Sequence, residues 1–215
     1  MTQTSLRISE IFYSLQGEAL NVGCPTVFVR LTGCPLRCHY CDTAYAFSGG
    51  EWMALDAIVA ELKQYRTQYV TVTGGEPLAQ PNCIALLKKL CDEGYQVSLE
   101  TSGALDISSV DKRVVRVMDI KTPASGEEDK NLWANLHCLT EHDQIKFVIA
   151  DHDDYLWSRQ CLQERHLDNY CEVLFSPSNE QLQAQQLADW VLQDQLPVRF
   201  QIQLHKYLWG NQRGK

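Results

Sequence analysis

Three cysteines stand close together in the stretch from Gly33 to Thr43. Cys34, Cys38 and Cys41 follow the spacing C-x3-C-x2-C, so one short loop can place three thiolates around a compact metal group. Iron–sulfur clusters are held by cysteine thiolates, usually four of them. Because this loop lacks a fourth cysteine, the pattern predicts a 4Fe-4S cluster with three protein ligands and one iron open to a small molecule.

Zinc is the alternative occupant of this loop, because it also binds cysteine and histidine and His39 lies among the cysteines. Structural zinc sites usually combine two separated pairs of ligands, and no second C-x2-C pair occurs here. The chain has nine cysteines, an odd number, and residues 1–9 do not resemble an export signal. A disulfide framework is therefore a poor interpretation of them. The six scattered cysteines are expected to be plain thiols: Cys24, Cys83, Cys91, Cys138, Cys161 and Cys171.

The segments around the loop alternate between apolar β-branched runs and helical patterns. Strands are expected at 26–31, 69–73, 96–100, 114–120, 144–149, 171–175 and 199–204, and helices at 55–65, 82–91, 153–164 and 181–192. This alternation predicts an α/β fold with mostly parallel strands and helices outside. A complete eight-stranded barrel usually needs about 250 residues. We therefore expect a partial, open β/α barrel, with residues 1–215 as one domain and the cluster loop at 33–43.

Polar residues and glycines follow several of these strands. They are Cys34, Gly74, Thr101, Lys121 and Ser176. In parallel sheets and barrels, functional groups gather beyond the carboxyl ends of the strands. The sequence therefore predicts one site at that edge.

Composition narrows the choice of partners. Of 215 residues, 19 are basic and 27 acidic, giving a net charge of −8, which offers no electrostatic footprint for nucleic acid or an anionic membrane. No apolar run of about 20 residues suggests a membrane span. We expect a cytoplasmic protein that binds neither nucleic acid nor membrane.

The cysteine loop, with Tyr40 before its last cysteine, resembles the radical S-adenosylmethionine (SAM) superfamily. The resemblance implies that the open iron binds the amino and carboxylate groups of SAM. It also implies that an electron from the cluster splits SAM into methionine and a 5'-deoxyadenosyl radical, which removes a hydrogen atom from the substrate. The cofactor then supplies the difficult chemistry, while the protein holds and orients it.

Thr73-Gly74-Gly75-Glu76-Pro77 looks like the Gly-Gly-Glu segment of this superfamily, which binds the SAM amino group. Paired glycines allow a ligand to approach the backbone closely, although such a segment alone is more often a turn. Polar groups at later strand ends would contact SAM, or would only end strands and cap helices. The SAM contacts implied by the resemblance are Tyr40, Gly74, Gly75, Glu76, Thr101, Ser102, Asp119, Ile120, Lys121, Leu174, Phe175, Ser176 and Pro177.

Over essentially the whole chain, the motifs are similar to those of the 7-carboxy-7-deazaguanine synthase family. They are Glu10 to Glu18, Arg30, Cys41-Asp42-Thr43, Thr73 to Pro77, Glu100 to Gly103 and His205-Lys206-Tyr207. That family converts 6-carboxy-5,6,7,8-tetrahydropterin to 7-carboxy-7-deazaguanine with loss of ammonia, regenerating SAM and using Mg2+. The resemblance implies Thr43 as the Mg2+ ligand. It implies pterin contacts from Leu15, Gln16, Gly17, Glu18, Arg30 and Thr73.

Arg30 gives this interpretation its strongest support. A charged residue inside an apolar strand needs a partner, and the planar guanidinium of arginine suits a substrate carboxylate. The family also implies a flavodoxin or ferredoxin as electron donor and a homodimer. His205, Lys206 and the tail 208–215 receive no role from the sequence. Two alternatives stay open: a radical SAM activase that makes a glycyl radical on a partner enzyme, and a zinc-stabilised binding module.

Overall fold

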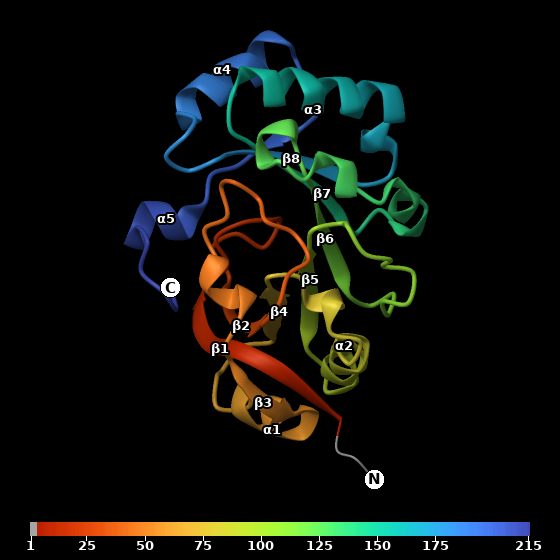
Figure 1. The fold of residues 1–215 in the computed structure, drawn as a ribbon, viewed down its shortest axis with the longest axis vertical. Coiled ribbons are helices and arrows are strands. Elements are labelled where there is room, and N and C mark those ends of the chain that lie inside the picture. Colours follow the sequence, from red (N-terminus) through yellow and green to blue (C-terminus); the bar gives the residue numbers. More distant parts are fainter. Residues whose placement is uncertain (1–3) are drawn as a thin grey trace.

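The computed structural model describes residues 4–215, which form one nine-stranded sheet flanked by helices (Figure 1). The strand order is β3-β1-β2-β4-β5-β6-β7-β8-β9. From β2 to β9 each strand is parallel to its neighbour, whereas β1 is antiparallel to both β2 and β3. The sheet does not close on itself, so the predicted open barrel of mostly parallel strands is confirmed.

The strands are β1 Ser5–Leu15, β2 Pro25–Leu31, β3 Glu51–Ala54, β4 Tyr69–Gly74, β5 Gln96–Thr101, β6 Val115–Ile120, β7 Gln144–Ile149, β8 Glu172–Pro177 and β9 Arg199–Phe200. The α-helices are α1 Leu55–Leu62, α2 Cys83–Asp92, α3 His152–Arg165, α4 Ala184–Gln193 and α5 Leu204–Trp209. Short 3-10 turns cover Ala44–Phe47, Pro77–Ala79, Pro123–Ser125, Glu128–Lys130, Trp133–Cys138 and Leu167–Asn169.

The two faces of the curved sheet have opposite chemistry. On the outer face, residues such as Val29, Val72, Leu99 and Phe147 join the helices in one apolar core. In Figure 1, α3 and α4 cover the β7–β8 end of the sheet. Since successive side chains in a strand point to opposite faces, the residues between these core positions must point inward. The inner face therefore carries the polar residues of the strands.

Two predictions about the strands were wrong. The sequence analysis missed β1 and β3, so the Gln16–Glu18 motif follows a strand instead of preceding the first one. The alternation of β1 is interrupted, because a register shift between Ile8 and Glu10 breaks the two-residue period of its apolar side chains. The final strand, expected at 199–204, ends at Phe200.

The chain leaves the sheet there because it packs on the β1–β2 turn. The side-chain oxygen of Gln201 accepts a hydrogen bond from the Ala19 amide at 2.9 Å, and the Leu204 amide donates to the Gly17 carbonyl at 2.9 Å. These contacts favour a new helix, α5, in place of further strand. The C-terminal segment therefore returns to the β1 side of the molecule, as Figure 1 shows.

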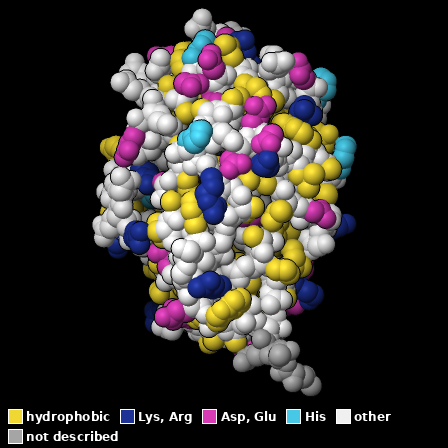
Figure 2. All heavy atoms as spheres, in the orientation of Figure 1, with side chains coloured by type: hydrophobic (Ala, Val, Ile, Leu, Met, Phe, Trp, Pro, Cys, Tyr) yellow, Lys and Arg dark blue, Asp and Glu magenta, His cyan; other side chains and the backbone are white. Residues whose placement is uncertain are grey.

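The described surface mixes charges of both signs. Figure 2 shows acidic and basic side chains interspersed over the face in view. In residues 4–215, no helix has the length and apolarity needed to cross a membrane.

Candidate functional site

A cavity of about 690 Å³ opens at the carboxyl ends of the parallel strands. It is lined by the inner face of the sheet, the cysteine loop, the β1–β2 turn and the C-terminal segment. The sequence-predicted residues that line it are Leu15, Gln16, Gly17, Glu18, Arg30, Cys34, Cys38, Tyr40, Cys41, Thr43, Thr73, Gly74, Gly75, Thr101, Ser102, Asp119 and Lys121. The sheet therefore brings together most residues that the sequence singled out.

The three cysteines of the loop share this cavity, and each is partly buried. Burial raises the pKa of the Cys34 thiol and raises that of Cys38 to about 11. Among residues 4–215, no three His, Cys, Asp or Glu side chains converge on a point as ligands for a single ion. An iron–sulfur cube instead needs thiols placed around a volume, and iron displaces their protons on binding. The donor set in this cavity fits such a cluster.

Glycine lets the next loop lie directly against the cysteines. A Cβ atom on Gly75 would stand 2.4 Å from the Gly33 carbonyl oxygen and 2.6 Å from Cys34 Cβ. The Glu76 amide donates to that same carbonyl at 2.8 Å. Any side chain at position 75 would push the two loops apart, so this position requires glycine.

Glu76 itself does not line the cavity. Its carboxylate is fully buried and accepts hydrogen bonds from the Thr101 hydroxyl at 3.0 Å and from the Ser102 amide and hydroxyl at 2.7 and 2.6 Å. It also accepts from the Leu78 amide at 3.0 Å. In this structure Glu76 ties the end of β4 to the end of β5, and it holds in place two residues that do face the cavity.

The other predicted SAM contacts outside the cavity are Ile120, Leu174, Phe175, Ser176 and Pro177. Ile120 and Phe175 belong to the apolar core, and Leu174 packs against Ala19 and Val117. The reason is that β8 continues to Pro177, two residues beyond the expected strand end. The cavity is lined instead by the residues after the strand, 178–181.

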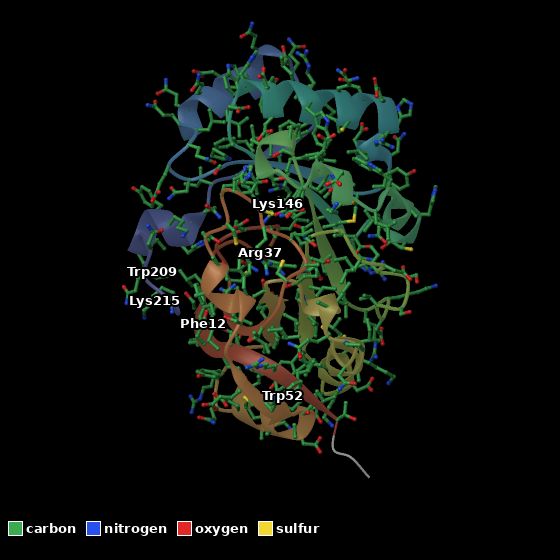
Figure 3. All side chains as sticks on the ribbon, viewed as in Figure 1. Phe12, Arg37, Trp52, Lys146, Trp209 and Lys215 are labelled. Atoms are coloured by element: carbon green, nitrogen blue, oxygen red, sulfur yellow. The ribbon has the colours of Figure 1, made fainter. Side chains whose placement is uncertain are left out.

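Buried charges form the inner wall of the cavity. Lys146 Nζ lies 2.7 Å from Glu18 Oε2 and 3.5 Å from Asp119 Oδ2, and Lys121 Nζ lies 3.1 Å from Asp119 Oδ1. Burial opposes the charge on Lys146, but the carboxylates, Glu18 first, raise its pKa well above the usual value. Figure 3 shows Lys146 near the middle of the molecule. Lys146 therefore stays charged, and the two lysines hold the carboxylates in fixed positions.

Gln16 extends this wall to a carboxyl group of different character. Its amide donates to Thr71 Oγ1 at 3.0 Å and to Glu100 Oε1 at 3.4 Å. Burial raises the pKa of Glu100, although Lys146 lowers it in part. The pKa of Glu18 is lowered instead, chiefly because Lys146 outweighs the effect of burial. The cavity therefore holds one carboxyl group, Glu100, that takes up a proton more readily, and a second, Glu18, that stays ionised.

Arg30 lies on the β1 side of the cavity, where its Nε binds Glu10 Oε1 at 2.7 Å. The Tyr45 hydroxyl donates to the same carboxylate oxygen at 2.8 Å, and the Arg213 guanidinium lies 3.8 Å from the centre of the Tyr45 ring. The Arg30 guanidinium carbon also lies over the Phe12 ring, 5.6 Å from its centre. The guanidinium of Arg30 is therefore held by its Nε edge.

The C-terminal segment was not assigned a role from the sequence, yet it forms one wall of the cavity. The residues concerned are Gln203, His205, Lys206, Asn211, Arg213 and Lys215. Lys206 Nζ lies 3.2 Å from Asp42 Oδ2, and Asp42 Oδ1 accepts from the Thr43 hydroxyl at 2.8 Å. Figure 3 shows Lys215 on the same side as Phe12. The basic residues of the tail were the available signal, but nothing in their spacing shows that the chain turns back.

Lys146 was missed as well, and Glu100 was named only within the Glu100 to Gly103 motif, without a role of its own. Lys146 is a lysine inside the apolar strand β7, the same signal that drew attention to Arg30 in β2. Glu100 precedes two residues that were selected. Both face the cavity because they share the inner face of the sheet with Arg30 and Asp119.

Comparisons with known proteins give a family match, full-length relatives and a shared fold. A family model described as the radical SAM superfamily matches residues 28–119. The 7-carboxy-7-deazaguanine synthase of Chlorobaculum tepidum is 44% identical over 212 residues, covering 97% of this chain and 96% of the relative. The enzyme of the same name from Koribacter versatilis is 42% identical and covers 95% of this chain and 97% of the relative. The crystal structure of QueE from Escherichia coli has the same fold, with a TM-score of 0.77, 23% identity and coverage of 94% and 95% of the two chains.

Proposed function

This chain belongs to the 7-carboxy-7-deazaguanine synthase family of radical SAM enzymes, and we propose that it converts 6-carboxy-5,6,7,8-tetrahydropterin to 7-carboxy-7-deazaguanine with loss of ammonia. The observation that carries this proposal is the 44% identity that extends over nearly the whole chain. The reaction is that of a carbon–nitrogen lyase and supplies the deazapurine precursor of queuosine biosynthesis. The cavity volume suits both a pterin and a SAM molecule.

Membership of the superfamily implies a 4Fe-4S cluster and SAM. We propose that Cys34, Cys38 and Cys41 hold the cluster, because these three thiols share the cavity. When reduced, the cluster supplies the electron that starts radical chemistry on SAM. The proposed SAM wall consists of the cavity-lining residues nearest the strand ends, namely Tyr40, Gly74, Gly75, Thr101, Ser102, Asp119 and Lys121.

The substrate is proposed to lie on the opposite side, against the β1–β2 turn. Leu15, Gln16, Gly17, Glu18, Arg30 and Thr73 are the residues proposed to contact it. The Nε edge of Arg30 is bound to Glu10, which orients the rest of the guanidinium for an anionic group such as a pterin carboxylate. Gln16 and Glu100 present amide and carboxyl groups that suit the donors and acceptors of a pterin ring.

We further propose that Thr43 is a ligand of Mg2+. Its hydroxyl lies in the cavity wall beside the Asp42 carboxylate, and a hard cation such as Mg2+ prefers oxygen donors. A magnesium ion there would bind the substrate carboxylate and offset negative charge during ring contraction.

The remaining proposals rest on the family resemblance and on composition. They are a flavodoxin- or ferredoxin-type electron donor, a homodimer, a cytoplasmic location and no binding of nucleic acid or membrane. The continuous sheet and its one large core support treating residues 1–215 as a single radical SAM domain. The relatives favour the synthase over a glycyl-radical activase, since they share one name and nearly full coverage.

The deciding experiment is anaerobic. The protein is reconstituted with iron and sulfide, reduced with dithionite, and given SAM, Mg2+ and 6-carboxytetrahydropterin, and the products are analysed by mass spectrometry. We expect a deazaguanine carboxylate without any protein partner. SAM cleavage without this product would refute the substrate assignment, whereas a colourless protein that retains only zinc would refute the radical mechanism.

A further inference from the structure

A short segment beyond β6 packs along the cysteine loop. This bracing segment comprises residues 122–127. The His39 amide donates to the Ser125 carbonyl at 3.0 Å, and His39 Nδ1 lies 3.2 Å from the Ala124 carbonyl oxygen. The Arg37 amide donates to the Glu127 carboxylate. Since Arg37 and His39 are the immediate neighbours of Cys38, the segment fixes the backbone on both sides of that cysteine.

The bracing segment is in turn held by one residue of helix α3. Asp154 accepts hydrogen bonds from the Thr122 hydroxyl at 2.9 Å and from the Ala124 amide at 2.9 Å. A third bond comes from the Ala150 amide at 3.0 Å. Thr122 Oγ1 also lies 3.4 Å from the Tyr40 hydroxyl, so the contacts run from α3 to a residue next to Cys41. Asp154 itself does not line the cavity.

Burial of the Asp154 carboxylate costs hydration free energy, so other contacts must compensate for it. The residue is 1% exposed, and no Lys, Arg or His among the described residues forms an ion pair with it. A buried carboxylate without a counter-charge is stable only when hydrogen bonds and a helix N-terminus compensate for lost hydration. Both bonds to the bracing segment would be lost if that segment moved, so Asp154 restrains it in one place.

We propose that Asp154 is a positioning residue for the iron–sulfur cluster, which acts through the bracing segment to keep Cys38 and Cys41 in place for iron. The inference rests on the proposed ligation by the three cysteines. Asp154 contacts neither iron nor SAM in this scheme. It stabilises the loop conformation in which the thiols face the cavity, and it slows loss of the cluster.

The first test compares two changes at the same helix end. Asp154→Asn keeps the shape of the side chain but places an amide nitrogen where hydrogen-bond donors now point. The matched control is Asp151→Ala, because Asp151 caps α3 by accepting from the Asp154 amide at 2.8 Å and has no bond to the bracing segment. The readouts are the iron and sulfide content after reconstitution, the anaerobic rate of iron loss to a chelator, and the Tm of the cluster-free protein.

We expect Asp154→Asn to lose iron about tenfold faster than the unmodified protein, since each lost bond to a charged acceptor is worth roughly that factor. Asp151→Ala should lower Tm yet leave the rate of iron loss unchanged. Equal rates for Asp154→Asn and the unmodified protein would overturn the inference. So would an equal acceleration in both variants, because Asp154 would then act only through the helix.

A second pair of variants decides the matter if Asp154→Asn does not fold. Gly126 has φ +74, and a Cβ there would lie 2.8 Å from His39 Cε1. Gly94 has φ +89 with nothing within 4 Å of such a Cβ. Gly126→Ala and Gly94→Ala thus introduce comparable backbone strain, but only the first displaces the His39 ring, whose Nδ1 contacts the Ala124 carbonyl of the bracing segment. Faster iron loss in Gly126→Ala alone supports the bracing role, and equal behaviour of the pair refutes it.

Cys38→Ala separates this inference from the proposed ligation. If Cys38→Ala still assembles the cluster, the ligation is wrong and the inference fails with it. If Cys38→Ala assembles none while Asp154→Asn and Gly126→Ala retain iron as their controls do, only the bracing role is refuted.

Discussion

The ion pair between Glu18 and Lys146 makes a strong prediction about stability. Glu18 is 8% exposed and lies 2.7 Å from Lys146, and Gln203 donates to its other oxygen at 2.9 Å. Burial alone would raise the pKa of Glu18, but Lys146 and then His205 outweigh it and lower that pKa from 4.5 to about 2. This difference corresponds to about 3 kcal/mol of folding free energy at neutral pH.

The sign follows from the direction of the shift. A carboxyl group whose pKa is lower in the folded protein stabilises it fully above its unfolded pKa of 4.5, and the contribution disappears as pH falls toward about 2. Glu18→Gln should therefore lower the free energy of unfolding by about 3 kcal/mol at pH 7 and by only about 1 kcal/mol at pH 3. For a chain of this size, the loss at pH 7 corresponds to a fall in Tm of about 6–12 °C.

The measurement is urea unfolding of the cluster-free protein from pH 7 to pH 3 under reducing conditions. Glu172→Gln is the matched control, because it breaks a pair with Arg199 at 3.0 Å in which both side chains are largely exposed. Such a surface pair contributes less than about 1 kcal/mol. A difference between Glu18→Gln and the unmodified protein that stayed constant with pH would refute the electrostatic reasoning.

Three further changes test the site. Cys38→Ala should abolish both the cluster absorbance and SAM cleavage, and turnover by this variant would contradict the proposed ligation. Thr43→Ala should keep its iron but require more Mg2+ for half-maximal activity, and an unaltered magnesium titration would remove Thr43 from the metal site. Gly17→Ala would place a methyl group against the His205 ring and 3.1 Å from the His205 backbone nitrogen, so the ring must turn away and the start of α5 must give way slightly. We expect KM for the pterin to rise about tenfold and the tail to become sensitive to protease. Gly23→Ala is the control, because its φ of +84 strains the same turn while nothing within 4 Å of its Cβ would be pushed toward α5.

The cysteine loop and the glycine pair could be predicted because their chemistry is local. Three thiols within eight residues limit the kinds of metal group that the loop can bind, independently of the rest of the chain. The buried parallel strands can also be recognised, because they appear as apolar runs. The C-terminal segment could not be predicted, because its position depends on the contact of Leu204 with Gly17 across 187 residues of chain. No local pattern encodes such a contact.

The charged residues within the strands show where sequence reasoning ends. Arg30, Arg116 and Lys146 each interrupt an apolar strand, yet only Arg30 and Lys146 line the cavity. Arg116 points to the other face, where it pairs with the buried Asp143 at 3.2 Å. The rule that a buried charge needs a partner applies to all three and distinguishes none of them.

What separates them is which face of the sheet each occupies. Asp119 and Lys146 are neighbours in the β6–β7 register, so they share the inner face, whereas Ile120 and Arg116 are an odd number of residues from Asp119 and point outward. Alternation is blurred in β6, because Arg116 puts a charge on the outer face and Val117 puts an apolar side chain on the inner face. Once Asp119 is placed in the cavity, the register assigns Lys146 to the same wall and Ile120 to the core. One fixed residue in each strand thus decides the roles of the others.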